Sequence, residues 1–344
     1  RPRRSSGWGT VPRMTRQLAA EGVAQVVVVT DEPHKYPTGD AFARGVTVHH
    51  RDALDRLQRE LQNVPGVTAI VYDQTCAAEK RRRRKAGAFP DPARRVVINE
   101  LVCEGCGDCG VQSNCLSIVP IETEFGRKRQ IDQQSCNKDF SCLKGFCPSF
   151  VTIEGGRLKT KQTLAGCGML PPAEQTTPVG AVSRILLAGI GGTGVVTVGA
   201  LLGMAARIEG LVASVNDVTG MAQKGGPVLG HVQIARDASS LAGERIPLGG
   251  ADLLLAIDLV VATMPDAMSR LGPHTHAIAN LDATQTGAFT RNIDALVDSD
   301  ALIERLRDRV ETVESLLALQ AARAAVGDPI AAGLLMTGYA IQGG

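Results

Sequence analysis

The chain has 344 residues, a formal net charge of +2 at pH 7 and only 3% aromatic residues. Nucleic-acid-binding proteins use basic surfaces and aromatic stacking platforms, so this balance argues against nucleic acid as a partner. The apolar fraction of 44% is enough for about two domains with buried cores. No apolar stretch is long enough and free enough of charge to span a membrane, and no apolar segment follows the basic N-terminal residues as in a signal peptide.

The first part of the chain has the pattern of an incomplete α/β domain. A short helix is predicted at residues 14–21, β-rich runs follow at 25–30 and 68–73, and leucines recur at helical spacing through 51–62. Strand, helix and strand in this order are typical of a parallel sheet. Because two strands are too few for a complete sheet of this kind, we interpret residues 1–87 as the C-terminal part of a larger domain.

Six consecutive cations, residues 80–85, end this part of the chain. Like charges in a row repel one another and seldom pack, so the run is interpreted as a solvated basic tether that leads into a linker. A nuclear-targeting or nucleic-acid patch is the alternative interpretation, but no supporting fold is predicted beside it.

The cysteines are the most informative residues. Nine are present, and seven of them lie between Cys103 and Cys147. A disulfide scaffold is usually shorter, secreted and even in its cysteine number. Clustered cysteines without a signal peptide indicate metal binding in a reducing compartment, which predicts a cytoplasmic protein. We predict that residues 88–170 form a small ferredoxin-like iron–sulfur segment.

Four of these cysteines have the spacing of an iron–sulfur site. Cys103, Cys106 and Cys109 are each separated by two residues, and Cys147 precedes a proline. In bacterial ferredoxins, a C-x2-C-x2-C loop and a distant cysteine before proline hold [4Fe–4S] clusters. Glycines in the loop permit its tight turns. Zinc, the alternative, favours two separate C-x2-C pairs. One [4Fe–4S] cluster on these four residues is therefore predicted.

A second cluster is a further hypothesis. Cys115, Cys136 and Cys142 would form a site that lacks one thiolate. The eighth ligand would be a non-cysteine group or a distant cysteine such as Cys167, or there would be no second cluster at all. Cys76 and Cys167 are otherwise interpreted as small hydrophobic residues. A dry shell around the metal is expected from apolar residues of the segment: Val102, Ile118, Val119, Val151 and Ile153.

The rest of the chain, residues 180–344, is predicted to form a second α/β domain. It opens with a strand at 184–190, a glycine-rich turn and a helix at 195–208. Further strands are predicted at residues 212–216, 228–235, 252–257 and 276–282, and a long helix at residues 301–322.

The glycine-rich turn has two interpretations. Gly189, Gly191 and Gly194 match the dinucleotide fingerprint G-x-G-x-x-G, and Asp217 lies near the end of the next strand, where an acid can bind ribose. The same glycines allow close packing of strand and helix without a ligand, and an alanine at Gly191 is then expected to strain the turn. A second loop offers N–H groups and a cation to an anion or a partner domain: Lys224, Gly225 and Gly226. No catalytic set of side chains is recognised.

From about residue 11 to its end, the chain resembles the long, fused bacterial indolepyruvate:ferredoxin oxidoreductases of the 2-oxoacid:ferredoxin oxidoreductase superfamily. The cysteine run CEGCGDCGVQSNC with CNKDFSCLKGFCP resembles their iron–sulfur segment. YDQTCAAEKRRRRKAG resembles the end of their thiamine-diphosphate domain. GIGGTGVVTVGALLG with GMAQKGGPVLGHVQI resembles their γ-type domain.

The resemblance implies a reaction. An aryl-2-oxoacid such as indolepyruvate is oxidatively decarboxylated, coenzyme A captures the acyl group, and electrons pass through [4Fe–4S] to ferredoxin. A homo-oligomer is expected, with neither nucleic acid nor a membrane as partner. The resemblance implies that residues 1–87 are the end of a thiamine-diphosphate domain and that the glycine turn serves packing and domain contact. The second hypothesis is an iron–sulfur protein with an NAD- or FAD-binding Rossmann-like domain, and the third is a zinc-stabilised nucleic-acid-binding module.

One motif of the family is missing. Thiamine enzymes of this type hold the diphosphate and Mg2+ with a G-D-G motif and a later Asn, and the chain contains no G-D-G. We therefore expect an internal fragment or a truncated relative that is inactive toward a 2-oxoacid by itself.

Overall fold

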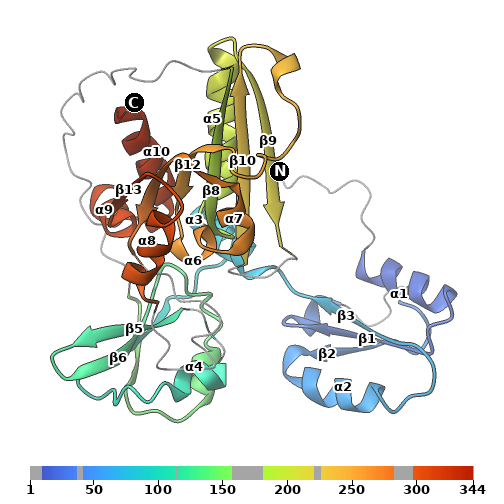
Figure 1. Cartoon of the computed structure of the whole chain (residues 1–344). Helices are drawn as coiled ribbons and strands as arrows, with labels where there is room; N and C mark the ends of the chain where they lie inside the picture. Colours follow the sequence, from blue (N-terminus) through green and yellow to red (C-terminus); the bar gives the residue numbers. More distant parts are fainter. Residues whose placement is uncertain are drawn as a thin grey trace. The chain divides into compact units, whose positions relative to one another are not determined.

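The computed structural model describes residues 10–36, 42–113, 115, 117–156, 181–220, 226–282 and 297–343. The chain divides into two compact units, residues 1–89 and 90–344, and each is described by itself (Figure 1). The first holds a small parallel sheet, and the second combines a cysteine-rich segment with a large mixed sheet. The predicted α/β fold class is thus confirmed.

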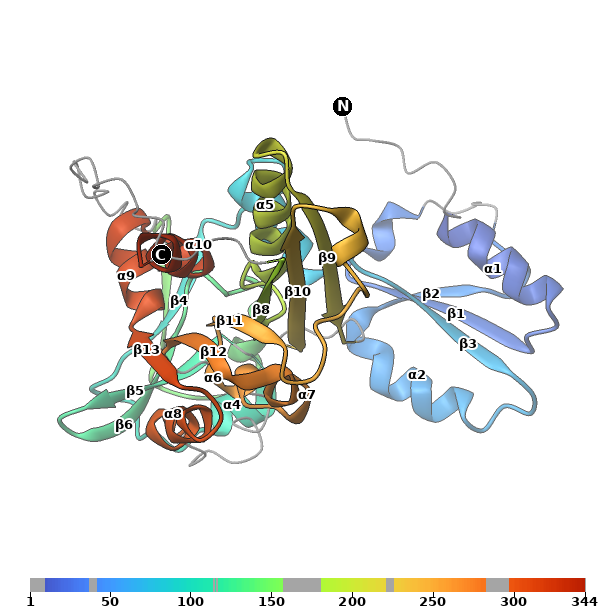
Figure 2. The ribbon, with the colours of Figure 1, turned by 45° about the horizontal axis from the view of Figure 1, so that its top comes forward.

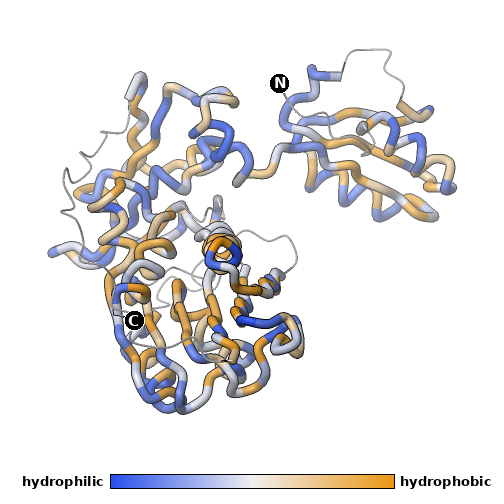
Figure 3. The backbone as a smooth tube through the Cα atoms, turned by 90° about the horizontal axis from the view of Figure 1, so that it is seen from above, coloured by the Kyte–Doolittle hydropathy of each residue, from blue (hydrophilic) through white to orange (hydrophobic). Residues whose placement is uncertain are grey.

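A three-stranded parallel sheet forms the first unit. Its order is β2 (Thr47–His50), β1 (Gln25–Thr30), β3 (Thr68–Asp73). The four valines of β1 are nearly inaccessible, since the central strand is covered on both faces. Helices α1 (Val11–Ala20) and α2 (Leu54–Leu61) are present as predicted. Figure 3 shows the hydrophobic run of β1 and the alternating colours of the amphipathic α2.

The run of six cations is not a tether, contrary to the prediction. It lies in a helix, α3 (Ala77–Lys85). Glu79 compensates the charge, because it pairs with Arg82 at 2.7 Å and Arg83 at 2.6 Å, three and four residues along. Lys80 forms an ion pair with Asp31 after β1. Local pairing and an anion from another element thus remove part of the repulsion on which the prediction rested.

Two antiparallel ribbons frame the cysteine segment. β4 (Arg94–Ile98) pairs with β7 (Phe150–Glu154), and β5 (Ile118–Thr123) pairs with β6 (Gly126–Ile131). A short helix, α4 (Asp108–Ser113), and a 3-10 turn, η3 (Ser141–Lys144), lie in the loops between them.

The apolar shell of this segment differs from the prediction. Ile118 is buried as expected, and Val119 is half-buried, but Val102, Val151 and Ile153 are exposed. Because β7 belongs to a two-stranded ribbon, its alternate residues have no second layer to cover them. The hydrophobic cluster consists of other residues: Ile98, Cys103 and Ile118, with Ile131 and Phe150 packed against them.

A six-stranded sheet dominates the second unit, in the order β13-β12-β11-β8-β10-β9. The first four of these strands run parallel, and β10 runs antiparallel to both of its neighbours. The strand bounds are β8 (Val182–Ile190), β9 (Val212–Thr219), β10 (Pro227–Ala235), β11 (Ala251–Ala256), β12 (Leu271–Asn280) and β13 (Thr312–Leu316).

Helices cover both faces of this sheet (Figure 2). One face carries α5 (Val195–Ile208), α9 (Ala318–Val326) and α10 (Ala332–Gln342), whose apolar residues pack with Leu187 of β8. On the opposite face Leu186 packs with residues of the other three helices: α6 (Leu259–Ala262), α7 (Pro265–Arg270) and α8 (Ser299–Arg307). Adjacent residues of one strand thus serve separate cores.

The long helix predicted for residues 301–322 is wrong. The chain instead forms α8, the edge strand β13 and then α9. β13 pairs with β12 from Thr312 to Leu316, and Glu314 contacts His276 at 2.9 Å. Pairing with a distant strand outweighs the local helix propensity. Within the described residues, no single helix could cross a membrane; a bent pair, Ala318–Val326 with Pro329–Gln342, passes by length and composition only.

Candidate metal centre

The first cysteine loop leaves β4 and returns at α4. Gly105 has φ +74° and Gly107 has φ +75°, and the two flank Cys106. The N–H of Gly105 donates to Sγ of Cys103 at 3.4 Å. A Cβ added to Gly105 would lie 2.1 Å from the carbonyl oxygen of Arg127 in β6. The loop therefore requires glycine here both for its backbone angle and for its contact with the neighbouring hairpin.

All four cysteines predicted for the first cluster line one cavity of about 640 Å³. Cys103, Cys106 and Cys109 reach it from the first loop, and Cys147 reaches it from the chain before β7. Sγ of Cys147 lies 3.0 Å from Oγ of the buried Ser149. Cys142 lines the same cavity. The fold thus brings together thiols that are far apart in the sequence, as the C-x2-C-x2-C…C-P pattern predicts.

Electrostatic coupling divides the thiols into two sets. Burial raises the pKa of the Cys109 thiol to about 11, with smaller contributions from Cys106 and Cys103. Burial likewise raises the pKa of Cys142 to about 11, and Cys115 and Cys136 add to the effect. Each set therefore contains three thiols that influence one another.

A buried cation faces the first set. Arg129 of β6 is 2% exposed and lines the cavity. Its charge opposes the rise in the pKa of Cys109. Burial lowers the pKa of the Arg129 guanidinium itself, whereas the nearby cysteines counteract that effect. Arg129 was not predicted from the sequence; its position two residues from the partly buried Ile131 in a β-strand was the available signal.

The residues present fit an iron–sulfur cluster in several respects. In the described part of the chain, no three His, Cys, Asp or Glu side chains stand close enough together to hold a metal ion. Thiols with a pKa near 11 are protonated at neutral pH, and metal binding must displace those protons before thiolates can converge. The cavity, the N–H to sulfur bond, the apolar shell and the Arg129 charge match the needs of an anionic cluster bound by thiolates.

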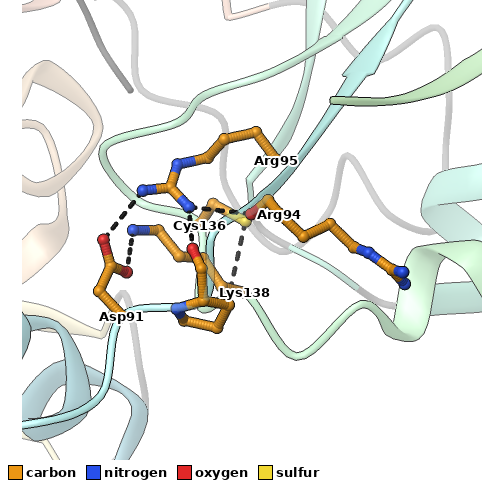
Figure 4. Close-up of polar contacts among 6 residues, drawn as sticks. Asp91, Arg94, Arg95, Cys136 and Lys138 are labelled. Carbon is orange, nitrogen blue, oxygen red and sulfur yellow. Dashed lines mark hydrogen bonds and ion pairs between the residues drawn. The ribbon is translucent and has the colours of Figure 1, made fainter. Parts of the chain in front are cut away.

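The second cysteine loop is anchored by an ion-pair network (Figure 4). Asp91 accepts hydrogen bonds from Lys138 and from Arg95, the latter at 2.9 Å. Burial alone would raise the pKa of the Asp91 carboxyl, but Lys138 and Arg95 bring it below its usual value. The N–H of Lys138 donates to Sγ of Cys136 at 3.4 Å. The network thus ties Lys138, whose N–H contacts Cys136, to the chain just before β4.

The glycine turn between β8 and α5 is shaped by packing. The N–H of Gly191 donates to the carbonyl oxygen of Gly226 at 2.8 Å, so it is already engaged within the protein. A Cβ on Gly189 would lie 2.6 Å from Cγ2 of the buried Val195. Gly194 precedes α5 with φ +93°. These contacts favour the packing interpretation. Two residues of the second loop, Lys224 and Gly225, lie outside the described residues.

The position of Asp217 also differs from that in a dinucleotide site. In the Rossmann fold the ribose-binding acid follows the strand directly beside the first strand. Here β10 lies between β8 and β9, and Asp217 of β9 pairs with Gly230 of β10. Burial raises the pKa of the Asp217 carboxyl. The acid therefore does not lie beside the glycine turn as the fingerprint requires.

Alanine substitutions at the glycines of this turn are expected to differ in their effect on stability. Gly189→Ala is expected to lower the free energy of unfolding by about 2 kcal/mol, because its Cβ overpacks the buried Val195. Gly191→Ala is expected to change it by less than about 0.5 kcal/mol. The Gly191 backbone lies outside the positive-φ region and the nearest atom to its Cβ is 3.5 Å away, so the predicted strain there is wrong. Urea unfolding measures the change in the free energy of unfolding for both variants. A rise in the melting temperature of the wild type on addition of NADH would contradict the packing interpretation.

The fold and the site together define a class of protein. It is an α/β protein in which a doubly covered mixed sheet follows a small segment of two β-ribbons, and that segment gathers cysteines from two loops around a cavity.

Comparison with known proteins finds relatives of the second α/β domain. Residues 184–344 match the family model of pyruvate ferredoxin/flavodoxin oxidoreductases. Indolepyruvate oxidoreductase subunit IorB of Thermococcus kodakarensis is 37% identical over 79 residues, which are 23% of this chain and 38% of that protein. The same subunit of Methanothermobacter thermautotrophicus is 26% identical over 157 residues, 46% of this chain and 76% of that protein. The similarity to this family thus lies in the second α/β domain, and the chain spans less than half the length of the Thermococcus kodakarensis relative.

Solved structures of related subunits show weaker similarity. Pyruvate oxidoreductase subunit PORC of Thermotoga maritima is 16% identical with a TM-score of 0.34, over 47% of this chain and 76% of that one. The γ subunit of a keto/oxoacid ferredoxin oxidoreductase from Geobacter sulfurreducens is 19% identical with a TM-score of 0.32, over 46% of this chain and 75% of that one.

Proposed function

We propose that this chain is the electron-transfer and γ-type portion of an aryl-2-oxoacid:ferredoxin oxidoreductase, with indolepyruvate as the substrate of the complete enzyme. The observation that carries the proposal is the cavity lined by Cys103, Cys106, Cys109 and Cys147, in a chain whose second domain matches this oxidoreductase family. The proposed segments are residues 1–87, the end of a thiamine-diphosphate domain, residues 88–170, the iron–sulfur segment, and residues 180–344, the γ-type domain.

The proposed cofactor is a [4Fe–4S] cluster, which supplies one-electron transfer between a thiamine-bound intermediate and ferredoxin. The chain's own residues shape this role. Four cysteines bind the cluster, and the apolar side chains of Ile98, Ile118 and Phe150 keep water away from it. Arg129 supplies a buried positive charge that favours the reduced, more negative state.

The remaining parts of the activity belong to the complete enzyme. Thiamine diphosphate, Mg2+, coenzyme A and the aryl-2-oxoacid are proposed to bind there, in a homo-oligomer that delivers electrons to ferredoxin. Because free thiols persist in reducing compartments, a cytoplasmic location is proposed.

Anaerobic purification tests the cluster. The protein is expected to be brown, with a broad absorption band in the blue region and equal amounts of iron and acid-labile sulfide. After reduction with dithionite and removal of the excess, oxidised ferredoxin should restore the absorption in a stopped-flow measurement. A colourless protein that contains zinc would contradict the proposal and favour a zinc-stabilised module.

Thiamine diphosphate is expected not to bind to this chain alone. The sequence contains no G-D-G motif to hold Mg2+ and the diphosphate. Calorimetric titration of the anaerobic protein with thiamine diphosphate and Mg2+ should give no saturable heat, and indolepyruvate should not reduce a viologen dye. Micromolar binding or dye reduction would contradict the assignment of this chain to a part of the enzyme.

A further inference from the structure

The second cysteine loop repeats the residue spacing of the first loop, with an aspartate in place of the central cysteine. The first has Cys103, Cys106 and Cys109 at intervals of two residues, and the second has Cys136, Asp139 and Cys142 at the same intervals. A carboxylate therefore occupies the central position that Cys106 has in the first loop.

The backbones of the two loops match at the residues that flank the central position. Gly105 and Gly107, with φ +74° and +75°, flank Cys106. Lys138 and Phe140, with φ +54° and +57°, flank Asp139. In both loops the residue before the central position donates its N–H to Sγ of the first cysteine at 3.4 Å.

The helical element that follows the central residue and the exposure of that residue match as well. The third cysteine is the second residue of a short helical element in each loop, Cys109 in α4 and Cys142 in η3. Both central residues, Cys106 and Asp139, are exposed, whereas both third cysteines are half-buried.

The second loop maintains this shape at an energetic cost. Lys138 and Phe140 are the two residues other than glycine with positive φ in the described part of the chain. A residue with a Cβ is strained at positive φ, and strain of this kind gathers at functional sites. Asp91 pairs with the Lys138 ammonium, and the Arg94 guanidinium lies 5.6 Å from the centre of the Phe140 ring. Side-chain contacts thus hold both residues in a conformation that glycine would adopt more easily.

The fourth member of each set is a cysteine that follows the other loop in the sequence. Cys147, which follows the second loop, lines the cavity with the first loop's cysteines. Cys115, which follows the first loop, packs against the same hydrophobic cluster as Cys142 of the second loop. This exchange of the last cysteine between two loops is the arrangement of two-cluster ferredoxins.

We infer that Asp139 is the missing eighth ligand, so that Cys115, Cys136, Asp139 and Cys142 hold a second [4Fe–4S] cluster in which one iron is bound by a carboxylate. The inference rests on the proposed function. A carboxylate is a hard oxygen ligand and binds iron of such a cluster less firmly than a soft thiolate does. The iron at Asp139 is therefore expected to leave and return more readily than the other three.

Mild anaerobic oxidation of the full chain tests this. One electron passes from the [4Fe–4S]2+ form to ferricyanide, Fe2+ leaves from Asp139, and [3Fe–4S]+ remains on the three cysteines. The EPR signal of an oxidised three-iron cluster should appear, native mass spectrometry should show the loss of one iron, and Fe2+ with dithionite should reverse both changes. Asp139→Cys should abolish the conversion, and Asp139→Ala should contain the three-iron form as purified.

Asp108 of the first loop provides the matched control. It lies two residues after Cys106 and accepts a hydrogen bond from Gln112 at 3.3 Å. Asp108→Ala should behave as the wild type does. If both Asp139 variants match the wild type in iron content and EPR, or if Cys136→Ala loses no iron, the inference is wrong while the first cluster stands. If the wild-type chain contains no iron and sulfide, the proposed function fails instead.

Discussion

Cys106→Ala is expected to remove the four-iron form of the first cluster, with a loss of at least one iron per chain. Cys106 is the central residue of the first loop and lines the cavity with Cys103, Cys109 and Cys147. With three thiolates left and no carboxylate at that position, a complete cubane has only three protein ligands. The low-potential EPR signal that dithionite produces should fall accordingly, and iron analysis measures the same loss.

Cys76→Ala serves as the control for this experiment. Cys76 is an exposed free cysteine outside the cysteine segment, and its removal changes the thiol count by the same amount. The control should retain wild-type iron and EPR intensity. Iron and signal at wild-type levels in Cys106→Ala would overturn the ligand assignment.

Gly105→Ala is expected to be the most damaging substitution in the segment that leaves every cysteine in place. A positive φ costs an alanine about 1–2 kcal/mol, and overpacking adds about 1–3 kcal/mol. The new Cβ would lie 2.1 Å from a carbonyl oxygen of β6, a backbone atom that cannot turn aside as a side chain can. We expect the first loop to separate from the β5–β6 hairpin, with loss of the cluster.

Gly110→Ala is the matched control, because its Cβ would meet no atom within 4 Å and its φ is not positive. Iron content and hydrogen exchange of the β5–β6 amides report the two effects separately. Faster exchange and lost iron are expected in Gly105→Ala, and neither in Gly110→Ala. Wild-type exchange in Gly105→Ala would show that the loop does not depend on this contact.

Local patterns predicted much of the fold. The valine-rich β1, the strand β3 and the helix α5 have the predicted bounds. Each is a continuous, mostly apolar run of residues, so its own residue types indicate where it begins and ends. The spacing of Cys103, Cys106 and Cys109 likewise predicted a common cavity, because two-residue intervals fix the geometry of the loop itself.

Tertiary contacts decided the rest. Leu316 belongs to a strand rather than a helix because β12 offers hydrogen bonds along the sheet edge. The cations of α3 form a helix because Glu79 and Asp31 lie close enough to pair with them. Glu79 directly precedes the cations, but Asp31 and β12 lie too far away in the sequence to be seen in a local window. Pairing with such distant partners overrides local propensity.

The site divides in the same way. The sequence by itself determined which cysteines have metal-ligand spacing, because that spacing is a property of a short loop. Only the tertiary structure placed Arg129 beside Cys109 and showed that Lys138 and Phe140 give the second loop the backbone of the first. The Asp91 contact with Lys138 joins residues 47 positions apart, and the local β5–β6 hairpin that carries Arg129 lines the cavity with Cys109 only once the segment has folded. Spacing along the chain governs local geometry, whereas the field and the strain at a site arise from the residues that folding brings around it.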